Sequence, residues 1–300
     1  MKYYKRRKDI TVFGHRGARG IYPENTMAGF QYLQDIGINA VEIDVQNAAN
    51  RVTVIAHDPY VNMPNTKNGK IHKQLIRNTK AIDITKITAG APCSGSDYTT
   101  QFPDQARLSS QYIPMFATFC EWAVKHPRLI LNVEVKSHAE QTDLYDPPEI
   151  IVSDVVDLLD KYDLQHRCIL SSFDWRVLHA CAKRAPGLAR GYLSLEQNHG
   201  TTMNPNIVDR SSWMGGVTRA DYDDSLPQTI AALGGKVWCP YFKDLTQEAL
   251  VKAQDLGLLV NVWTVNALDD INRMADMGVN GIISDYPARV QNVLAQGTGV

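Results

Sequence analysis

Alternating carboxylates mark two short apolar stretches of the chain. Residues 41–45 read VEIDV and residues 132–136 read NVEVK. Side chains two residues apart on a strand share a face, so Glu42 and Asp44, and likewise Glu134 and Lys136, are predicted to project inward from buried strands. Buried charges without partners cost several kcal/mol each. A bound divalent cation would compensate the acids, and hard oxygen ligands without cysteine or clustered histidine favour Mg²⁺ or Ca²⁺.

Two basic residues and two histidines accompany these acids. Arg16 can direct two donors onto one phosphate, and Lys136 can add a point charge, so the set is typical of a phosphate ester site. The imidazoles of His15 and His57 titrate near neutrality. In phosphodiester cleavage, one imidazole can take a proton from the attacking oxygen while the other gives one to the leaving alcohol.

Each residue alone also has a simpler interpretation. Glu134 and Lys136 could form a cross-strand ion pair, Trp263 could be core packing, and a single histidine at a strand end is commonly structural. Their predicted placement at one end of one sheet favours a shared site.

The elements that would hold these residues alternate between short β-branched runs and helical patterns. This alternation is typical of βα units with a parallel sheet, and eight strands of this kind predict a single (β/α)8 TIM barrel. The expected strands are 10–14, 40–46, 129–136, 168–173, 188–194, 236–241, 258–265 and 281–284; the expected helices include 25–35, 116–125, 149–161, 175–184, 246–255 and 268–277. In a parallel barrel, reactive groups gather at the C-terminal ends of the strands, where all the candidates fall.

One segment interrupts the alternation. Residues 52–56 follow the second strand after a turn too short for a helix, so we expect an antiparallel hairpin. Residues 59–111 show weak periodicity and predict an insertion, either a small subdomain or a long loop. Its part from 67 to 86 carries six basic residues and one acid. That run is typical of a solvated cationic surface, with steering of an anionic substrate as the alternative.

Composition limits the classes of function. The chain has 300 residues, 44% of them hydrophobic, and a net charge of −1. This balance argues against nucleic acid and anionic membrane as partners, and no apolar run is long enough to span a bilayer. Five scattered cysteines without metal-site spacing suit a reducing compartment, so a cytoplasmic protein is expected. A secreted or periplasmic protein that had lost its signal peptide would read the same way. The oligomeric state is not encoded in a recognisable pattern.

The motifs taken in order resemble the glycerophosphodiester phosphodiesterase family. They run from His-Arg-Gly at 15–17 and Pro-Glu-Asn-Thr at 23–26 through Glu-x-Asp at 42–44, His-Asp at 57–58 and Glu-x-Lys at 134–136; they continue with Ser-Phe at 172–173, Trp-Thr-Val-Asn at 263–266 and Asp-Tyr-Pro at 285–287. Each motif is weak alone. Together they span nearly the whole chain.

The resemblance implies an enzyme of phospholipid and glycerol metabolism that hydrolyses glycerophosphodiesters to sn-glycerol 3-phosphate and an alcohol with one divalent cation, Mg²⁺ or Ca²⁺. It makes Glu42, Asp44 and Glu134 the metal ligands and His15 and His57 the acid and base; Arg16 and Lys136 would hold the phosphate, and Trp263 and Phe173 would line the glycerol or alcohol end.

Three alternatives stay open: a lysophospholipase D activity, another phosphodiester as the substrate, and a catalytically silent phosphodiester-binding barrel. The chain departs from the family pattern at residues 59–66 and 113–118, which leaves the preference for the alcohol undecided.

Overall fold

The computed structural model describes residues 9–64, 71–89, 97–200, 204–208 and 210–297. Within these ranges a nine-stranded sheet closes on itself because β1 pairs with both β11 and β2; eight of its strands run parallel, while β3 is antiparallel to β2. The strands of the barrel are β1 (Thr11–Gly14), β2 (Ala40–Asn47), β6 (Ile130–Val135), β7 (Cys168–Ser172), β8 (Ala189–Ser194), β9 (Val237–Pro240), β10 (Leu259–Val262) and β11 (Gly281–Ser284).

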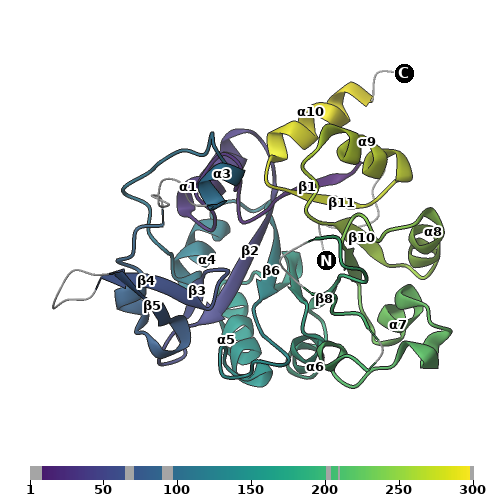
Figure 1. The fold of residues 1–300 in the computed structure, drawn as a ribbon, viewed down its shortest axis with the longest axis horizontal. Helices are drawn as coiled ribbons and strands as arrows, with labels where there is room; N and C mark the ends of the chain where they lie inside the picture. Colours follow the sequence, from purple (N-terminus) through teal and green to yellow (C-terminus); the bar gives the residue numbers. More distant parts are fainter. Residues whose placement is uncertain (1–8, 65–70, 90–96, 201–203, 209, 298–300) are drawn as a thin grey trace.

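Helices surround this barrel (Figure 1). They are α1 (Met27–Asp35), α4 (Phe116–Val124), α5 (Pro148–Lys161), α6 (Trp175–Arg184), α7 (Leu226–Ala232), α8 (Gln247–Asp255), α9 (Leu268–Met277) and α10 (Pro287–Gly297), with short 3₁₀ turns η2 (Gln165–Arg167), η3 (Ser212–Met214) and η4 (Arg219–Tyr222). One helix follows each barrel strand along the chain, so the predicted (β/α)8 fold is confirmed.

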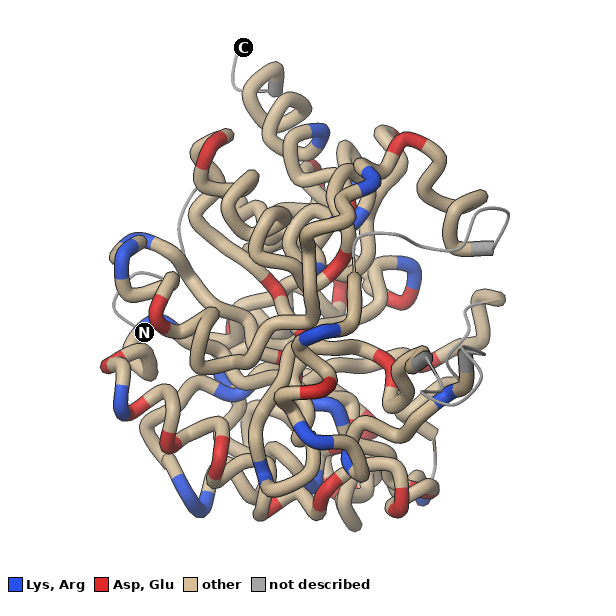
Figure 2. The backbone as a smooth tube through the Cα atoms, turned by 90° about the vertical axis from the view of Figure 1, so that its left-hand side faces the viewer, with Lys and Arg blue, Asp and Glu red and all other residues tan. Residues whose placement is uncertain are grey.

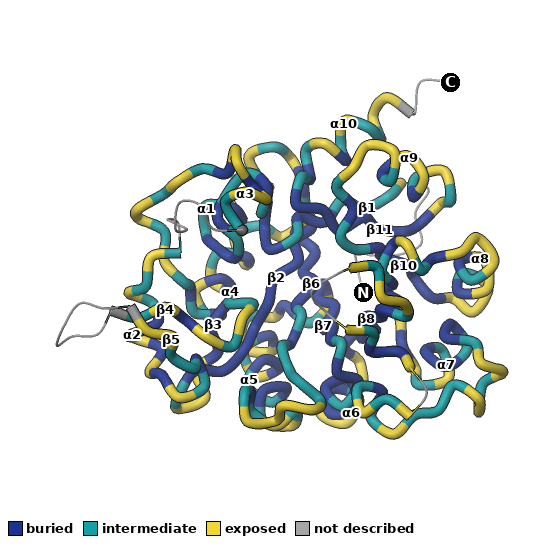
Figure 3. The backbone as a smooth tube through the Cα atoms, in the orientation of Figure 1, coloured by how far each residue is buried: buried dark blue, intermediate teal, exposed yellow. Residues whose placement is uncertain are grey.

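The two faces of each strand differ in what they contact. On β2, Val41, Ile43 and Val45 join the large apolar layer between the strands and the helices. The alternate position Ala40 belongs to a smaller cluster that fills the barrel interior, together with residues such as Phe13 and Ile130. Burial is nearly continuous along the barrel strands and falls off on the outer helices (Figure 3). The inward positions nearer the C-terminal end of β2 are Glu42 and Asp44, so charged side chains are buried at this end of the barrel.

The segment after β2 folds beside the barrel. β3 (Thr53–Ile55) pairs antiparallel with β2, as expected, and is followed by a hairpin of β4 (Tyr60–Pro64) and β5 (Ile71–Leu75) and by η1 (Ile76–Asn78), α2 (Ala81–Ile84) and α3 (Asp97–Gln101). A separate small cluster, which includes Val54, Val61, Ile76 and Ile84, packs under it. Lys67 and Lys70 of the expected basic run lie outside the described residues.

Charged residues of both signs are interspersed over the side of the molecule that Figure 2 presents. No helix among the described residues has the length and apolarity to cross a membrane. The four described cysteines, Cys120, Cys168, Cys181 and Cys239, are free thiols buried in the core, and Cys93 lies outside the described residues.

Candidate active site

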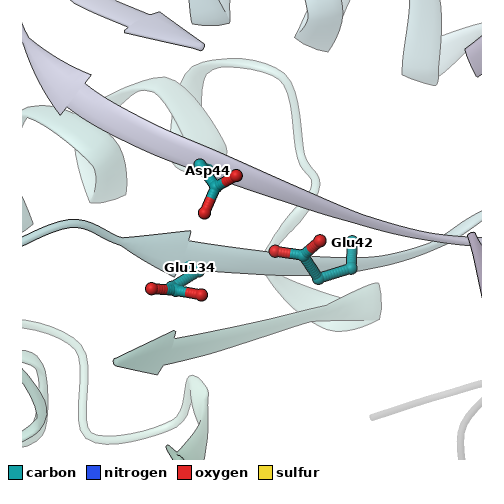
Figure 4. Close-up of side chains that lie close together, drawn as sticks. All are labelled: Glu42, Asp44 and Glu134. Carbon is teal, nitrogen blue, oxygen red and sulfur yellow. The ribbon is translucent and has the colours of Figure 1, made fainter. Parts of the chain in front are cut away.

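The three predicted acids meet at the C-terminal end of the barrel. β2 and β6 pair in a register that sets Asp44 beside Glu134 and Glu42 beside Asn132. One carboxylate oxygen from each of Glu42, Asp44 and Glu134 lies within 4.8 Å of the others. Figure 4 shows the three carboxylates turned toward one another from the two neighbouring strands. The strand alternation predicted from the sequence therefore produces a real cluster.

Glu42 is the least compensated of the three acids. Its Oε2 accepts a hydrogen bond from the backbone N–H of Arg16 at 2.9 Å, while the buried Oε1 has no hydrogen-bond partner among the described residues. Burial raises the pKa of Glu42 well above its usual value, and the nearby charges of Asp44 and Glu134 raise it further. An unsatisfied buried carboxylate beside two others is the environment that a cation would relieve, so the donor set fits a divalent ion.

Asp44 has several partners. Its Oδ2 accepts from Asn25 Nδ2 at 2.9 Å and lies 3.2 Å from Arg16 Nε, and its Oδ1 lies 3.5 Å from Lys136 Nζ. Burial alone would raise the pKa of Asp44, but the charges of Arg16 and Lys136 outweigh it and lower this pKa well below its usual value. Asp44 is therefore ionised at neutral pH.

A left-handed turn positions Arg16. Arg16 (φ 49°) and Gly17 (φ 88°) follow β1, and this turn is what aims the Arg16 N–H at Glu42. Its guanidinium is held by Asp44 and by Glu24, whose Oε1 lies 3.0 Å from Nη1. Burial lowers the pKa of Arg16, but these acids outweigh it and keep the group charged. Glu24 contacts both Arg16 and Arg19.

Lys136 follows β6 and points into the same cluster. Its Nζ donates to Glu134 Oε1 at 2.6 Å. Burial lowers the pKa of Lys136, but Glu134 and Asp44 outweigh this effect and raise it. Two cations, Arg16 and Lys136, thus face three carboxylates, and Arg16 also pairs with Glu24, so acidic groups outnumber basic ones here.

His15 is held by a residue far away in the chain. Its Nδ1 lies 2.7 Å from Asp285 Oδ1, and its Nε2 lies 3.9 Å from Glu42 Oε2. Asp285 is itself oriented by Asn266, whose Nδ2 donates to Oδ2 at 2.7 Å and whose Oδ1 accepts from the Asp285 N–H at 3.0 Å. This leaves the Nε2 edge of His15 facing the acidic cluster.

His57 lies just past the end of β3. It follows Asp44 in the chain, whereas His15 precedes it. Its Nδ1 lies 2.7 Å from Asp58 Oδ1, and 33% of its side chain is exposed. Burial, Arg16 and Lys136 together lower the pKa of His57. At neutral pH His57 is therefore predominantly neutral, as a proton acceptor must be.

Aromatic residues face the mouth from the strands beyond β6. Phe173 and Trp263 contact each other edge to face, with ring centroids 5.1 Å apart, and both pack on the barrel interior. The indole N–H of Trp263 donates to the Cys239 carbonyl at 2.9 Å. Both predicted aromatic residues thus lie on the barrel end that carries the acids.

The geometry can be compared with known proteins. The family model described as the glycerophosphoryl diester phosphodiesterase family matches residues 15–289. The chain belongs to this family. A solved structure of a putative glycerophosphoryl diester phosphodiesterase from Silicibacter pomeroyi is 32% identical, with a TM-score of 0.81 over 96% of this chain and 94% of that one.

Other relatives cover the chain equally well. A glycerophosphodiester phosphodiesterase from Caldanaerobacter subterraneus is 26% identical over 95% of this chain and 98% of its own length. The fold is also shared by an Oleispira antarctica phosphodiesterase, solved in complex with the product sn-glycerol-3-phosphate, at 22% identity and a TM-score of 0.68, covering 95% of this chain and 96% of that one.

Two contacts of the site had no role in the sequence interpretation. Asp285 and Asn25 each stood in a family motif without an assigned partner. In the structure, Thr26 caps α1 by accepting from Gly29, while Asn25 (φ 56°) turns its side chain to Asp44. The signal in the sequence was an Asn immediately before a Thr that can cap a helix. Asn tolerates positive φ, so this pair indicates a left-handed turn just before the helix.

Proposed function

We propose that this protein hydrolyses glycerophosphodiesters to sn-glycerol 3-phosphate and an alcohol, with one divalent cation held by Glu42, Asp44 and Glu134. The observation that carries the proposal is the buried Glu42–Asp44–Glu134 cluster beside a histidine and two cations. Membership of the phosphodiesterase family supports the same reaction. When bound, the cation would polarise the phosphoryl group and stabilise charge that develops on its oxygens.

The phosphate would lie among Arg16, Lys136 and the acidic cluster. Both basic side chains are paired with carboxylates in the structure. Arg16 contacts Glu24 and Asp44, and Lys136 contacts Glu134. A cation on the carboxylates would weaken these ion pairs and release donors toward the substrate. Arg16 then supplies a planar fork and Lys136 a compact charge for the phosphoryl oxygens.

Proton transfer is assigned to the two histidines. His57, with its lowered pKa, takes the proton from the attacking hydroxyl. His15, held at Nδ1 by Asp285, gives a proton from Nε2 to the oxygen of the leaving alcohol as the phosphorus–oxygen bond breaks. Attack by water and attack by a glycerol hydroxyl, which gives a cyclic phosphate first, both use this acid and base. ³¹P NMR during turnover separates the two routes, because only the second accumulates a cyclic ester.

A substrate panel with the metal varied tests the proposal. Protein stripped with EDTA is supplied with Mg²⁺ or Ca²⁺ and given glycerophosphocholine, glycerophosphoethanolamine or a lysophospholipid. We expect release of glycerol 3-phosphate from the first two only when a cation is present. Preference for the lysophospholipid would overturn the substrate assignment, and full activity in EDTA would overturn the metal assignment. No turnover of any phosphodiester would favour the silent barrel.

A further inference from the structure

The inward-facing positions at the mouth divide into two halves. One half is charged and comes from β11, β1, β2 and β6. The other half is mainly aromatic and comes from β7, β9 and β10, with apolar Leu193 on β8 between β7 and β9. Side chains alternate along each strand, so the inward position after Ser171 of β7 is Phe173, the one after Cys239 of β9 is Tyr241, and the one after Asn261 of β10 is Trp263.

The aromatic half is one connected surface, here called the aromatic face and made of Phe173, Tyr241 and Trp263. Tyr241 and Trp263 are bridged through their backbones, and their ring centroids lie 5.1 Å apart; Trp263 contacts Phe173 at the same separation. All three side chains are half-buried. Because the Trp263 N–H is already bonded to a carbonyl, the face offers ring surface together with the Tyr241 hydroxyl.

Acidic groups lie at the Tyr241 end of the aromatic face. Asp244 is buried, lies 2.6 Å from His199 Nε2 and accepts from the Glu196 N–H, and the His199 ring lies 5.2 Å from that of Tyr241. Glu196 pairs with Arg219 at 3.0 Å. This end of the aromatic face therefore carries two carboxylates, one paired with an arginine and the other with a histidine.

Nearby carboxylates also act on the Tyr241 hydroxyl. Burial raises the pKa of Tyr241, and Asp244 and Asp270 raise it further. Asp270 is paired with Arg273 at 3.4 Å, whereas the ion-pair partner of Asp244 within the described part of the chain is His199. An acyl chain on this face would have to lie against these polar groups, whereas a cation would be attracted by them and by the negative faces of the rings.

We propose that the aromatic face binds the alcohol end of the substrate and selects a cationic alcohol, bearing a quaternary or primary ammonium, over a neutral polyol. The inference rests on the proposed function, because it places the phosphate at the acidic cluster and one ester arm across the barrel mouth. Ring faces attract ammonium groups, and the methyl groups of a quaternary ammonium bury apolar area against them.

The test compares glycerophosphocholine with glycerophosphoglycerol, which share the glycerol phosphate and differ in the charge of the alcohol. We expect kcat/KM to be roughly tenfold higher for glycerophosphocholine. Tyr241→Leu should lower that value by about tenfold and leave glycerophosphoglycerol within about twofold, while Tyr241→Phe, which keeps the ring, should retain the preference. Tyr162→Leu, at the opposite end of the barrel between α5 and β7, is the matched control.

The outcomes separate the inference from the reaction it depends on. Failure to hydrolyse either substrate would overturn the proposed function and the inference with it. Equal kcat/KM on both substrates in the wild type would overturn the inference alone. Equal losses of kcat/KM on both substrates in Tyr241→Leu, with the melting temperature unchanged, would place the glycerol end on the aromatic face. Higher activity on a lysophospholipid would place an acyl chain there. Either result would refute the selection of a cationic alcohol.

Discussion

Asp285 Oδ1 lies 2.7 Å from His15 Nδ1, across 270 residues of sequence and the joint between β11 and β1 that closes the barrel. Burial opposes ionisation of Asp285, but the charge of His15 and the bond to it lower the pKa of Asp285 below its usual value. The carboxylate therefore orients the ring, so that the Nε2 edge of His15 faces the acidic cluster.

Replacing Asp285 with Asn should lower kcat by about 100-fold with a small change in KM, because the ring loses its orienting charge while the phosphate ligands remain. The decisive measurement is a double-mutant cycle. In a His15→Ala background the Asp285→Asn change should cost little more activity, since both residues act through one proton transfer. A full further loss in that background would mean that Asp285 acts elsewhere.

Removing either imidazole should be more damaging than removing a histidine at the far end of the barrel. His15→Ala and His57→Ala are each expected to lower kcat by at least ~100-fold with the thermal unfolding curve preserved. His166→Ala, in η2 before β7, serves as the control and should turn over normally. Near-wild-type turnover in either site variant would refute the acid–base assignment.

The unsatisfied Glu42 carboxylate predicts a gain in stability on neutralisation. In EDTA, Glu42→Gln should raise the free energy of unfolding by about 1–2 kcal/mol, because the folded wild type must either keep a buried charge beside two others or take up a proton to neutralise it. The same variant should lose most of the rise in melting temperature that Mg²⁺ or Ca²⁺ gives the wild type.

Urea unfolding and thermal melts with and without metal measure both effects of this substitution. Glu248→Gln, on the exposed first turn of α8, is the matched control. An unchanged response of Glu42→Gln to the cation would show that Glu42 is not a ligand.

The pH–rate profile should carry the signature of His57. As the base, His57 must be neutral; because its pKa is lowered, it stays neutral to a pH below the usual histidine value of about 6.5. The acidic limb of kcat/KM should therefore fall below about pH 6.5. The bond to Asp58 raises the pKa of His57, so Asp58→Asn should move this limb still lower. A limb that shifts upward in Asp58→Asn would contradict the assignment.

Much of this protein follows from local pattern. The alternation in residues 41–45 and 132–136 places carboxylates on one face because successive side chains of a strand point in opposite directions. The repeated change from strand to helix pattern predicts eight βα units, and parallel strands bring their C-terminal ends to one mouth. These rules act on residues that are near one another in sequence, which is why the βα units and the strand face of each carboxylate were predictable. The contact of Glu134 with Glu42 and Asp44 further requires that β2 pairs with β6.

The remaining features depend on tertiary structure. The Asp285–His15 contact exists only because β11 pairs with β1, and the Asn25–Asp44 bond only because a left-handed turn faces β2. The division of the mouth into a charged half and the aromatic face likewise depends on the order of strands around the closed barrel. Sequence determines which face of its own strand a side chain takes; which distant groups share that space is decided when long-range pairing and packing close the sheet.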